Sequence, residues 1–513
     1  MNKNYYITTP IYYPSAKPHM GHAYSSIIAD FFARFKRLDG FNVHFLTGTD
    51  EHGLKIQRAA ESKNIDPLKF CNQISQTFRD LSNTLNLSNT DFIRTTEDRH
   101  KKTVQHLWTE LEKNDDIYLS KYSGWYSVSD EAFYNEDETV EKNGIKIAST
   151  SGSTVEWIEE ESYFFRLSKW EDKLLDYYEK NSTFISPKSR KNEVLSFVKS
   201  GLKDLSISRK TFSWGIKVPN NPEHVIYVWL DALTNYISAL NYPDIDDTLF
   251  KKFWPASIHL IGKDILRFHA VYWPAFLMAA KIPLPKKVYG HGWILSGDEK
   301  MSKSKGNILD PLDIIDTYGL DPLRYYLIKE VSFGNDGNIS IDRLEDCINS
   351  DLANNFGNLC QRVTTFAEKN CLSKIPENKR FNDDDFKILN KFTNNLSTIR
   401  EEIDKQNINY YIDFIINSLF EANKYFNDQE PWKKKDDKDR LNTIVYTSLE
   451  IIRKVSYMLY PIIPETIEKT LKIFNLKPED ISLESIATHN YLESGNDLKK
   501  VGILFKKIEK KND

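Results

Sequence analysis

The chain has 513 residues, of which 40% are hydrophobic and 28% are charged, and its formal net charge at pH 7 is −4. A charge this close to zero argues against a general nucleic-acid coat protein, which needs a large basic excess to release counterions from the backbone. The longest apolar stretch, residues 271–280, is far too short to span a membrane, and neither terminus shows a secretory or transit pattern, so we expect a soluble cytoplasmic protein.

The first predicted elements enclose a short motif. Residues 5–9 are rich in aromatic and β-branched side chains, which predicts a strand, and a helical pattern runs from Ala23 to Leu38. His19-Met20-Gly21-His22 lies between them. A helix N-terminus favours negative charge, Gly21 lets a nucleotide approach the backbone, and imidazoles donate to phosphate oxygens. We therefore predict a phosphate site with His19 and His22 as catalytic groups, although such histidines alone are as often capping or packing residues.

Four regions follow from the pattern of elements, in keeping with about three domains for this length. Residues 1–115 alternate strand and helix, which predicts the first half of a parallel sheet. Residues 116–225 are aromatic and punctuated by glycines, which predicts an inserted connective domain of short strands. The sheet resumes over residues 226–345, where residues 258–262 predict a buried strand. Residues 346–513 are helical, with apolar residues spaced by three and four over residues 389–403. The predicted fold class is α/β: a Rossmann-like parallel sheet split by an insertion and followed by an all-α bundle.

A second motif, Lys300-Met301-Ser302-Lys303-Ser304, lies in the third region with glycines on both sides. Such a loop is able to move, and two lysines over a triphosphate neutralise the charge that develops on departing pyrophosphate. We predict Lys300 and Lys303 as catalytic groups, with the larger share for Lys303. Alone, a lysine-rich pentamer is usually solvated surface; the prediction depends on both motifs occurring in this order.

The two motifs and several segments around them carry a resemblance to a known family. The segments are Pro10–Pro14, Leu46–Gly53, Tyr227–Ala232, Gly262–Ile265, Arg267–His269, Trp273–Ala275, and Asn358-Leu359 with Arg362. The chain is identified as a member of the class I aminoacyl-tRNA synthetase family, and it resembles the methionyl branch over essentially its full length. The resemblance implies ATP-dependent ligation of methionine to its cognate tRNA through methionyl-adenylate, with release of AMP and diphosphate, for initiator and elongator tRNA in translation.

Three groups of binding residues are implied by the same resemblance. The ATP group is Gly21, His291, Gly292, Met301, Ser302 and Ser304. The methionine group is Ile11, Tyr13, Asp50, Trp229, Ala232, Leu233, Tyr236, Ile265, His269 and Trp273. The anticodon-binding group, in the helical region, is Asn358, Arg362 and Trp432.

Physical reasons support these groups without proving them. A mostly aromatic and apolar site suits a thioether, with the Tyr13 hydroxyl as donor to sulfur and the Asp50 carboxylate as partner of the substrate ammonium. Single-stranded bases are recognised by stacking and by hydrogen bonds to their edges. Each aromatic alone is more often ordinary core, and Trp432 after Pro431 is also compatible with a helix-end core residue. Pro10 and Leu233 stand where the family often has alanine and proline, and we expect adjusted packing there.

The implied cofactor is ATP with Mg²⁺, bound mainly through the phosphates. Many family members carry a zinc knuckle in the connective domain, but here residues 125–131 have serine and aspartate where ligand cysteines would stand, and residues 149–152 supply no thiolate or imidazole. We predict no structural zinc and no other protein metal site. The four cysteines form no CxxC pair and are expected to be reduced core residues: Cys71, Cys347, Cys360 and Cys371.

The predicted partners are methionine, ATP and tRNA(Met), without a membrane. No dimerisation domain follows the bundle, so we expect a monomer. Two basic runs suit a defined RNA surface or ordinary solvated surface: Lys188, Arg190, Lys191, Lys199, Lys203, Arg209 and Lys210 in one, and Lys433, Lys434 and Lys435 in the other.

Other interpretations remain open. Another class I synthetase would share both motifs but would want a different amino-acid site or a longer insertion. A free-standing nucleotidyltransferase shares the logic of the first motif but leaves residues 346–513 unexplained. A non-catalytic tRNA-binding relative would keep the bundle but should lose motif residues, and all four predicted catalytic residues are present.

Overall fold

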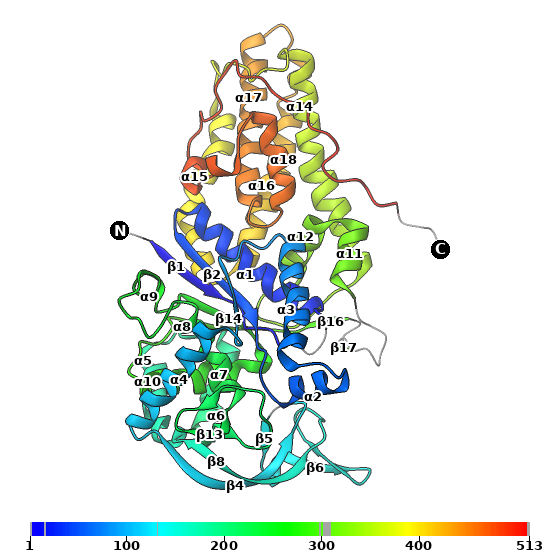
Figure 1. Cartoon of the computed structure of the whole chain (residues 1–513). Helices are drawn as coiled ribbons and strands as arrows, with labels where there is room; N and C mark the ends of the chain where they lie inside the picture. The colour runs from blue at the N-terminus through cyan, green and yellow to red at the C-terminus, as the bar shows by residue number, and fades with distance from the viewer. Residues whose placement is uncertain (1–2, 15–16, 131, 297–298, 301–308, 510–513) are drawn as a thin grey trace. The chain divides into compact units, whose positions relative to one another are not determined.

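The computed structural model describes residues 3–14, 17–130, 132–296, 299–300 and 309–509 (Figure 1). The chain divides into two compact units, which are described separately. The first, here called the sheet unit, comprises residues 4–29 and 43–291, and the second, the bundle unit, comprises residues 1–3, 30–42 and 292–513. No helix within the described ranges is long and apolar enough to cross a membrane.

A six-stranded sheet in the order β3-β2-β1-β14-β15-β9 organises the sheet unit. Its strands are β1 (Asn4–Thr8), β2 (Asn42–Thr49), β3 (Asp91–Arg94), β9 (Ile185–Ser186), β14 (Ile258–Gly262) and β15 (Val288–His291). The pairs β2–β3, β1–β14, β14–β15 and β15–β9 are parallel, which confirms the predicted fold class. The two predicted halves meet where Ile7 lies opposite Ile258. The strand β9 comes from within the region predicted as an insertion.

Helices surround this sheet in chain order. They are α1 (Met20–Leu38), α2 (Leu54–Ser62), α3 (Pro67–Thr84), α4 (Asp98–Lys113), α7 (Val228–Leu233), α8 (Asn235–Ser238), α9 (Thr248–Phe253) and α10 (Trp273–Ala279). The predicted helix at residues 23–38 is α1, which begins three residues earlier inside the first motif. A π-helical turn, Phe268–Tyr272, runs directly into α10.

The connective region is built mainly of antiparallel strands (Figure 1, lower part). Long strands β4 (Ile117–Ser127) and β8 (Glu156–Phe165) pair over their length and form a four-stranded sheet with β5 (Ala132–Tyr134) and β10 (Leu205–Ser206). The remaining elements are β6 (Thr139–Lys142), β7 (Ile145–Ala148), β11 (Ser208–Arg209), β12 (Lys217–Val218), β13 (Asn221–Ile226), α5 (Glu171–Lys180) and α6 (Lys188–Lys199).

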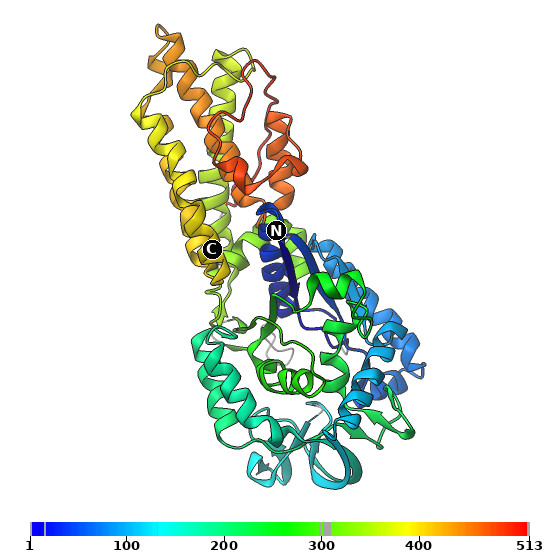
Figure 2. The ribbon, with the colours of Figure 1, turned by 90° about the vertical axis from the view of Figure 1, so that its left-hand side faces the viewer.

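The bundle unit is predominantly helical (Figures 1 and 2). A small sheet of β16 (Ile294–Ser296), β17 (Glu299–Lys300) and β18 (Gly337–Asn338) comes first. The helices are α11 (Pro311–Tyr318), α12 (Leu320–Glu330), α13 (Ile341–Cys347), α14 (Asn358–Asn370), α15 (Asp383–Asp404), α16 (Ile408–Asp428), α17 (Lys438–Leu459), α18 (Pro464–Leu471) and α19 (Leu483–Ile486). The predicted apolar spacing at residues 389–403 is the buried stripe of α15.

Residues 487–509, here called the C-terminal segment, return along the bundle. The amide of Ile375 donates to the carbonyl of Asn496, and the amide of Leu498 donates to that of Ser373. Farther on, the side-chain amide of Asn349 donates to the carbonyl of Ile508 and accepts from its backbone N–H. These bonds satisfy backbone groups of a segment that forms no helix or strand of its own.

Candidate active site

The histidines of the first motif form a closely packed pair at the start of α1. Their ring centroids lie 3.8 Å apart. The backbone N–H of His19 donates to His22 Nδ1, and that of Gly21 donates to His19 Nδ1, both at 3.1 Å. Because each Nδ1 accepts a hydrogen bond, a neutral ring carries its proton on Nε2. In that tautomer each ring has an Nε2–H able to donate, and the phosphate site itself stays a prediction.

Burial keeps His22 neutral. Burial, and secondarily the neighbouring His19, lower the pKa of His22 well below its usual value. Its ring packs edge-on against Tyr12 at 4.8 Å and Phe78 at 5.3 Å. Tyr12 is itself fixed by a 2.7 Å hydrogen bond with the Ser26 hydroxyl. The motif therefore presents a neutral, rigidly held imidazole.

Gly21 has a local packing role. A Cβ at this position would lie 3.0 Å from Cε1 of the His19 ring, tighter than ordinary contacts. Glycine therefore lets the His19 ring lie over the first turn of α1.

The predicted ATP contact His291 lies beside this helix. It is buried at the end of β15, where its Nε2 lies 2.8 Å from the Ser25 hydroxyl, and its ring packs edge-on against Tyr24. The Ser25 hydroxyl also bonds the carbonyl of Gly21. The structure thus brings His291 next to the first motif.

Gly292 and Lys300 belong to the bundle unit. A Cβ on Gly292 would lie 2.1 Å from the Asn335 carbonyl, so only glycine fits there. Lys300 is in β17, where it pairs with Leu295 of β16. The other predicted residues of the motif, Met301, Ser302, Lys303 and Ser304, lie outside the described residues.

The predicted methionine group comes from three parts of the sheet unit. Ile11, Tyr13 and Asp50 follow β1 and β2. Trp229, Ala232, Leu233 and Tyr236 lie on α7 and α8. Ile265 and His269 lie between β14 and α10, and Trp273 is the first residue of α10. Leu233, Tyr236 and Trp273 belong to one core cluster, against which Ile11, Trp229 and Ile265 pack. Six of the ten residues therefore belong to the same core or pack against it.

His269 has a defined protonation state. Its Nδ1–H donates to the carbonyl of Ile265 at 2.9 Å, so Nε2 accepts from the Tyr236 hydroxyl at 2.7 Å. Burial lowers the pKa of His269 to about 4. A neutral histidine and a committed tyrosine hydroxyl thus line this part of the site.

Two indoles stand out among the aromatic residues. Trp229 stacks on Phe268 with ring centroids 3.5 Å apart. The buried Nε1 atoms of Trp229 and Trp273 have no hydrogen-bond partner among the described residues. Aromatic faces with few committed polar atoms suit an apolar substrate side chain.

Tyr13 and Asp50 are held by backbone bonds. The Tyr13 hydroxyl, predicted to face sulfur, donates to the carbonyl of His52 at 3.1 Å. Asp50 is buried, and its amide donates to the carbonyl of Tyr12. His52 in turn belongs to a buried cluster with His100 and Asp231 that the sequence did not reveal. Two of its members lie in segments that carried the family resemblance, but nothing in the sequence indicated His100.

Asp130 occupies the stretch where zinc ligands would stand in other family members. Its carboxylate accepts from the hydroxyls of Tyr134, Ser151 and Ser153 at 2.5–2.8 Å, and its amide donates to the Ser127 hydroxyl. Hydrogen bonds around one carboxylate therefore join residues 127–134 to residues 151–153. Among the described residues, no group of three or more His, Cys, Asp or Glu could hold a metal ion. All four cysteines are buried and free, as predicted.

Two of the predicted anticodon residues surround one phenylalanine of the bundle. The Arg362 guanidinium lies 5.5 Å from the Phe426 ring, and Trp432 packs edge-on against the same ring at 6.2 Å. Arg362 also donates to the Asn427 side chain at 2.6 Å, a residue that the sequence did not indicate. Asn358 lies one turn before Arg362 on α14, on the same helix face. Trp432 is 41% exposed, so it is not a core residue.

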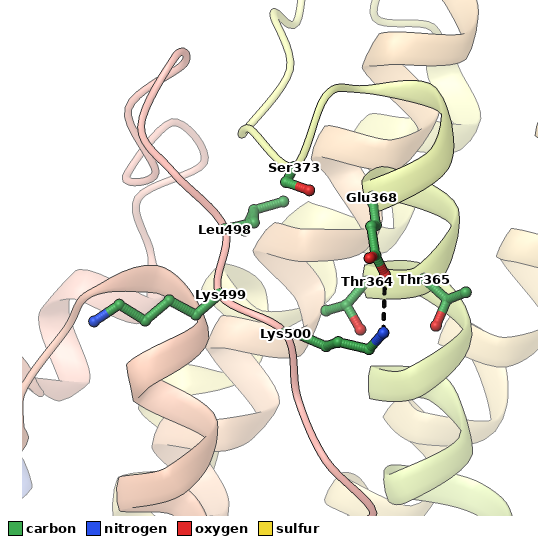
Figure 3. A pocket seen from close by; sticks show the side chains of 7 residues that line it. All are labelled: Thr364, Thr365, Glu368, Ser373, Leu498, Lys499 and Lys500. Atoms are coloured by element: carbon green, nitrogen blue, oxygen red, sulfur yellow. Dashed lines mark ion pairs between the residues drawn. The ribbon is translucent and has the colours of Figure 1, made fainter.

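A small pocket lies between α14 and the C-terminal segment (Figure 3). Lys500 pairs with Glu368 there at 3.6 Å. The pocket is lined by Thr364, Thr365, Glu368, Ser373, Leu498, Lys499 and Lys500. None of these residues belongs to the predicted sites.

Comparison with known proteins decides the family. The model for "tRNA synthetases class I (M)" matches residues 5–146 and 142–364, and that for "Anticodon binding domain of methionyl tRNA ligase" matches residues 375–513. The chain belongs to the methionyl class I tRNA synthetases. This confirms the family recognised from the two motifs.

Individual relatives agree over nearly the whole chain. Methionine–tRNA ligase of Rickettsia conorii is 51% identical over 99% of this chain and 100% of its own, and that of Brucella suis is 50% identical over 97% and 96%. Methionyl-tRNA synthetase of Mycobacterium tuberculosis, solved in complex with methionyl-adenylate, has a TM-score of 0.95 at 44% identity and covers 98% of this chain and 99% of its own. The free form of that enzyme has a TM-score of 0.90 at 41% identity, over 100% and 99%.

Proposed function

We propose that this chain ligates methionine to its cognate tRNA at the expense of ATP, through methionyl-adenylate, for initiator and elongator tRNA in translation. The observation that carries the proposal is the match of two methionyl family models, catalytic and anticodon-binding, to successive parts of one chain. The relative solved with methionyl-adenylate supports the same intermediate.

In the first step, the methionine carboxylate attacks the α-phosphate of ATP in line and pyrophosphate leaves. His19 and His22 donate from Nε2 to phosphate oxygens, and Lys300 and Lys303 offset the charge on the leaving group. No side chain forms a covalent bond to the substrate. The remaining ATP contacts are Gly21, His291, Gly292, Met301, Ser302 and Ser304.

Mg²⁺ would be held by the phosphates of ATP, whose charge it offsets. The imidazoles of the first motif carry Nε2–H groups in the tautomer that their backbone partners favour, so they fit a site to which the nucleotide brings its own cation. In the second step, a ribose hydroxyl of the terminal tRNA adenosine attacks the adenylate carbonyl.

Methionine is held by charge at one end and by apolar packing at the other. Asp50 pairs with its ammonium, and the Tyr13 hydroxyl exchanges the His52 carbonyl for the substrate sulfur. The side chain packs among Ile11, Trp229, Ala232, Leu233, Tyr236, Ile265, His269 and Trp273. The anticodon is recognised by Asn358, Arg362 and Trp432, whose exposed indole offers a stacking face.

The same proposal covers organisation. We assign residues 1–115 and 226–345 to the catalytic domain, 116–225 to the connective domain and 346–513 to the anticodon-binding domain. The protein acts as a monomer without structural zinc, in the cytoplasm, where charged tRNA is consumed.

Amino-acid-dependent ATP–pyrophosphate exchange across all twenty amino acids tests the function. Methionine alone should drive exchange, and Lys303→Ala should suppress it by about a hundredfold, the loss typical of one transition-state donor. Lys142→Ala, an exposed lysine of the connective region, is the matched control and should exchange normally. Exchange driven by another amino acid contradicts the substrate, and no exchange by folded protein contradicts catalysis.

A further inference from the structure

A buried cluster of three titratable residues lies beside the proposed methionine site. Asp231 of α7 and His100 of α4 are fully buried, and His52 is 3% exposed. Asp231 Oδ2 lies 2.6 Å from His52 Nδ1, and Oδ1 lies 2.7 Å from His100 Nε2. One carboxylate therefore joins three segments of the sheet unit that are far apart in sequence.

Asp231 is an acceptor for both rings. Burial alone would raise the pKa of its carboxyl, but His52 and His100 outweigh that effect and hold the pKa below its usual value. The group is thus ionised near neutral pH, and each histidine donates one N–H to it. The other nitrogen of His100 lies 2.8 Å from the Ser238 hydroxyl of α8, which extends the network to a fourth element.

Both ends of the network reach residues of the methionine group. On α7, Asp231 lies between Trp229 and Ala232. On the other side, His52 lies two residues after Asp50, and its carbonyl accepts the Tyr13 hydroxyl.

The backbone around His52 has a second support. The Trp214 indole donates to the carbonyl of Glu51 at 2.6 Å, and the amide of Gly53 donates to the carbonyl of Trp214 at 3.1 Å. Neither bond involves Asp231, which supplies the side-chain link between this turn and α7.

We propose that Asp231 is a positioning residue of the methionine site: through His52 and His100 it fixes the turn carrying Asp50 against the helix carrying Trp229. The inference rests on the proposed function, because the methionine site is part of that proposal. It assigns Asp231 to methionine binding and not to chemistry on ATP. When a side chain must meet a charge on the substrate, a displacement of about 1 Å is able to lower the reaction rate by up to about a hundredfold.

Exchange kinetics of Asp231→Asn test the proposal. The amide keeps the volume but cannot accept from both rings. The expected result is a rise in the KM for methionine on the order of tenfold, with the KM for ATP and kcat each within about twofold of the parent chain. The matched control is Asp116→Asn, which removes another buried carboxylate of the sheet unit, bonded to Lys169 and Trp170. The control should leave the KM for methionine unchanged.

A second pair of variants keeps the test decisive if Asp231→Asn folds poorly. His100→Gln retains a donor for Asp231 and should recover most of the methionine affinity that His100→Leu loses. The inference is overturned if Asp231→Asn leaves the KM for methionine unchanged, or if both KM values and kcat change together as in a loosened fold. Failure of the proposed function is distinct, because the parent chain itself would then show no methionine-dependent exchange.

Discussion

Two carboxylates of the sheet unit, Asp231 and Asp130, each collect several side-chain partners in opposite surroundings. Asp231 is fully buried and bonds two imidazoles, whereas Asp130 is half-buried and bonds hydroxyls. Both have a lowered pKa: burial would raise it in each case, but histidines outweigh burial at Asp231 and hydroxyl donors do so at Asp130. Both are therefore ionised near neutral pH, and what differs is the cost of losing each one.

Removal of the buried carboxylate should have the largest effect. Asp231→Leu leaves two buried imidazole donors without their acceptor, and each buried donor left unsatisfied costs about 1–3 kcal/mol of unfolding free energy. Urea unfolding followed by tryptophan fluorescence measures it. Asp231→Asn, which still accepts one hydrogen bond, should lose less. A loss in Asp231→Leu no greater than that of an exposed aspartate would contradict the comparison.

The half-buried carboxylate should matter less and only locally. Asp130→Ala removes three hydroxyl bonds to a group that water partly solvates, so we expect a loss of about 1–2 kcal/mol. Amide hydrogen exchange should accelerate in residues 127–134 and 149–153, while the KM for methionine stays unchanged. Asp137→Ala, an exposed neighbour, is the control. Faster exchange throughout the six-stranded sheet would show that Asp130 is not a local link.

The contribution of Asp130 to the free energy of unfolding should also depend on pH, which sharpens the comparison between the two carboxylates. Because the folded-state pKa lies below that of the unfolded chain, the carboxylate adds stability that is fully present above the unfolded value of about 4 and is lost as the pH falls through the lower folded value. The difference in unfolding free energy between the parent chain and Asp130→Asn should thus be constant from pH 7 to 5 and shrink below pH 4. A difference that grows on acidification would reverse the assigned direction.

The same comparison shows what the sequence could reveal. Local patterns predicted β1, α1, β14 and the stripe of α15, because each depends on the order of neighbouring residues. The first motif also predicted imidazole donors at a helix start, which the bonds of His19 and His22 support.

Contacts between residues far apart in the chain could not be predicted from the sequence in this way. His52, His100 and Asp231 come together only through the fold, and the same holds for Asn427, which meets Arg362 across 65 positions. The strand β9 is two residues long, too short for any periodic signal, although it completes the main sheet. Sequence reasoning therefore predicts contacts within elements and motifs better than contacts between them.

A third buried group, His269, hydrogen-bonds a backbone carbonyl and a tyrosine hydroxyl and gives the smallest expected effect. Burial lowers its pKa to about 4, so the folded chain binds no proton there while the unfolded chain does so below about 6.5. Its contribution to stability is therefore present above pH 6.5 and declines as the pH falls toward 4. Between pH 6 and 8 the imidazole should stay neutral and keep accepting the Tyr236 hydroxyl. Long-range ¹H–¹⁵N spectra of the histidine rings, assigned with His269→Gln, should show no change for His269 in that interval. An inflection near pH 6.5 would mean that water reaches the ring, and that burial does not suffice to fix its protonation state.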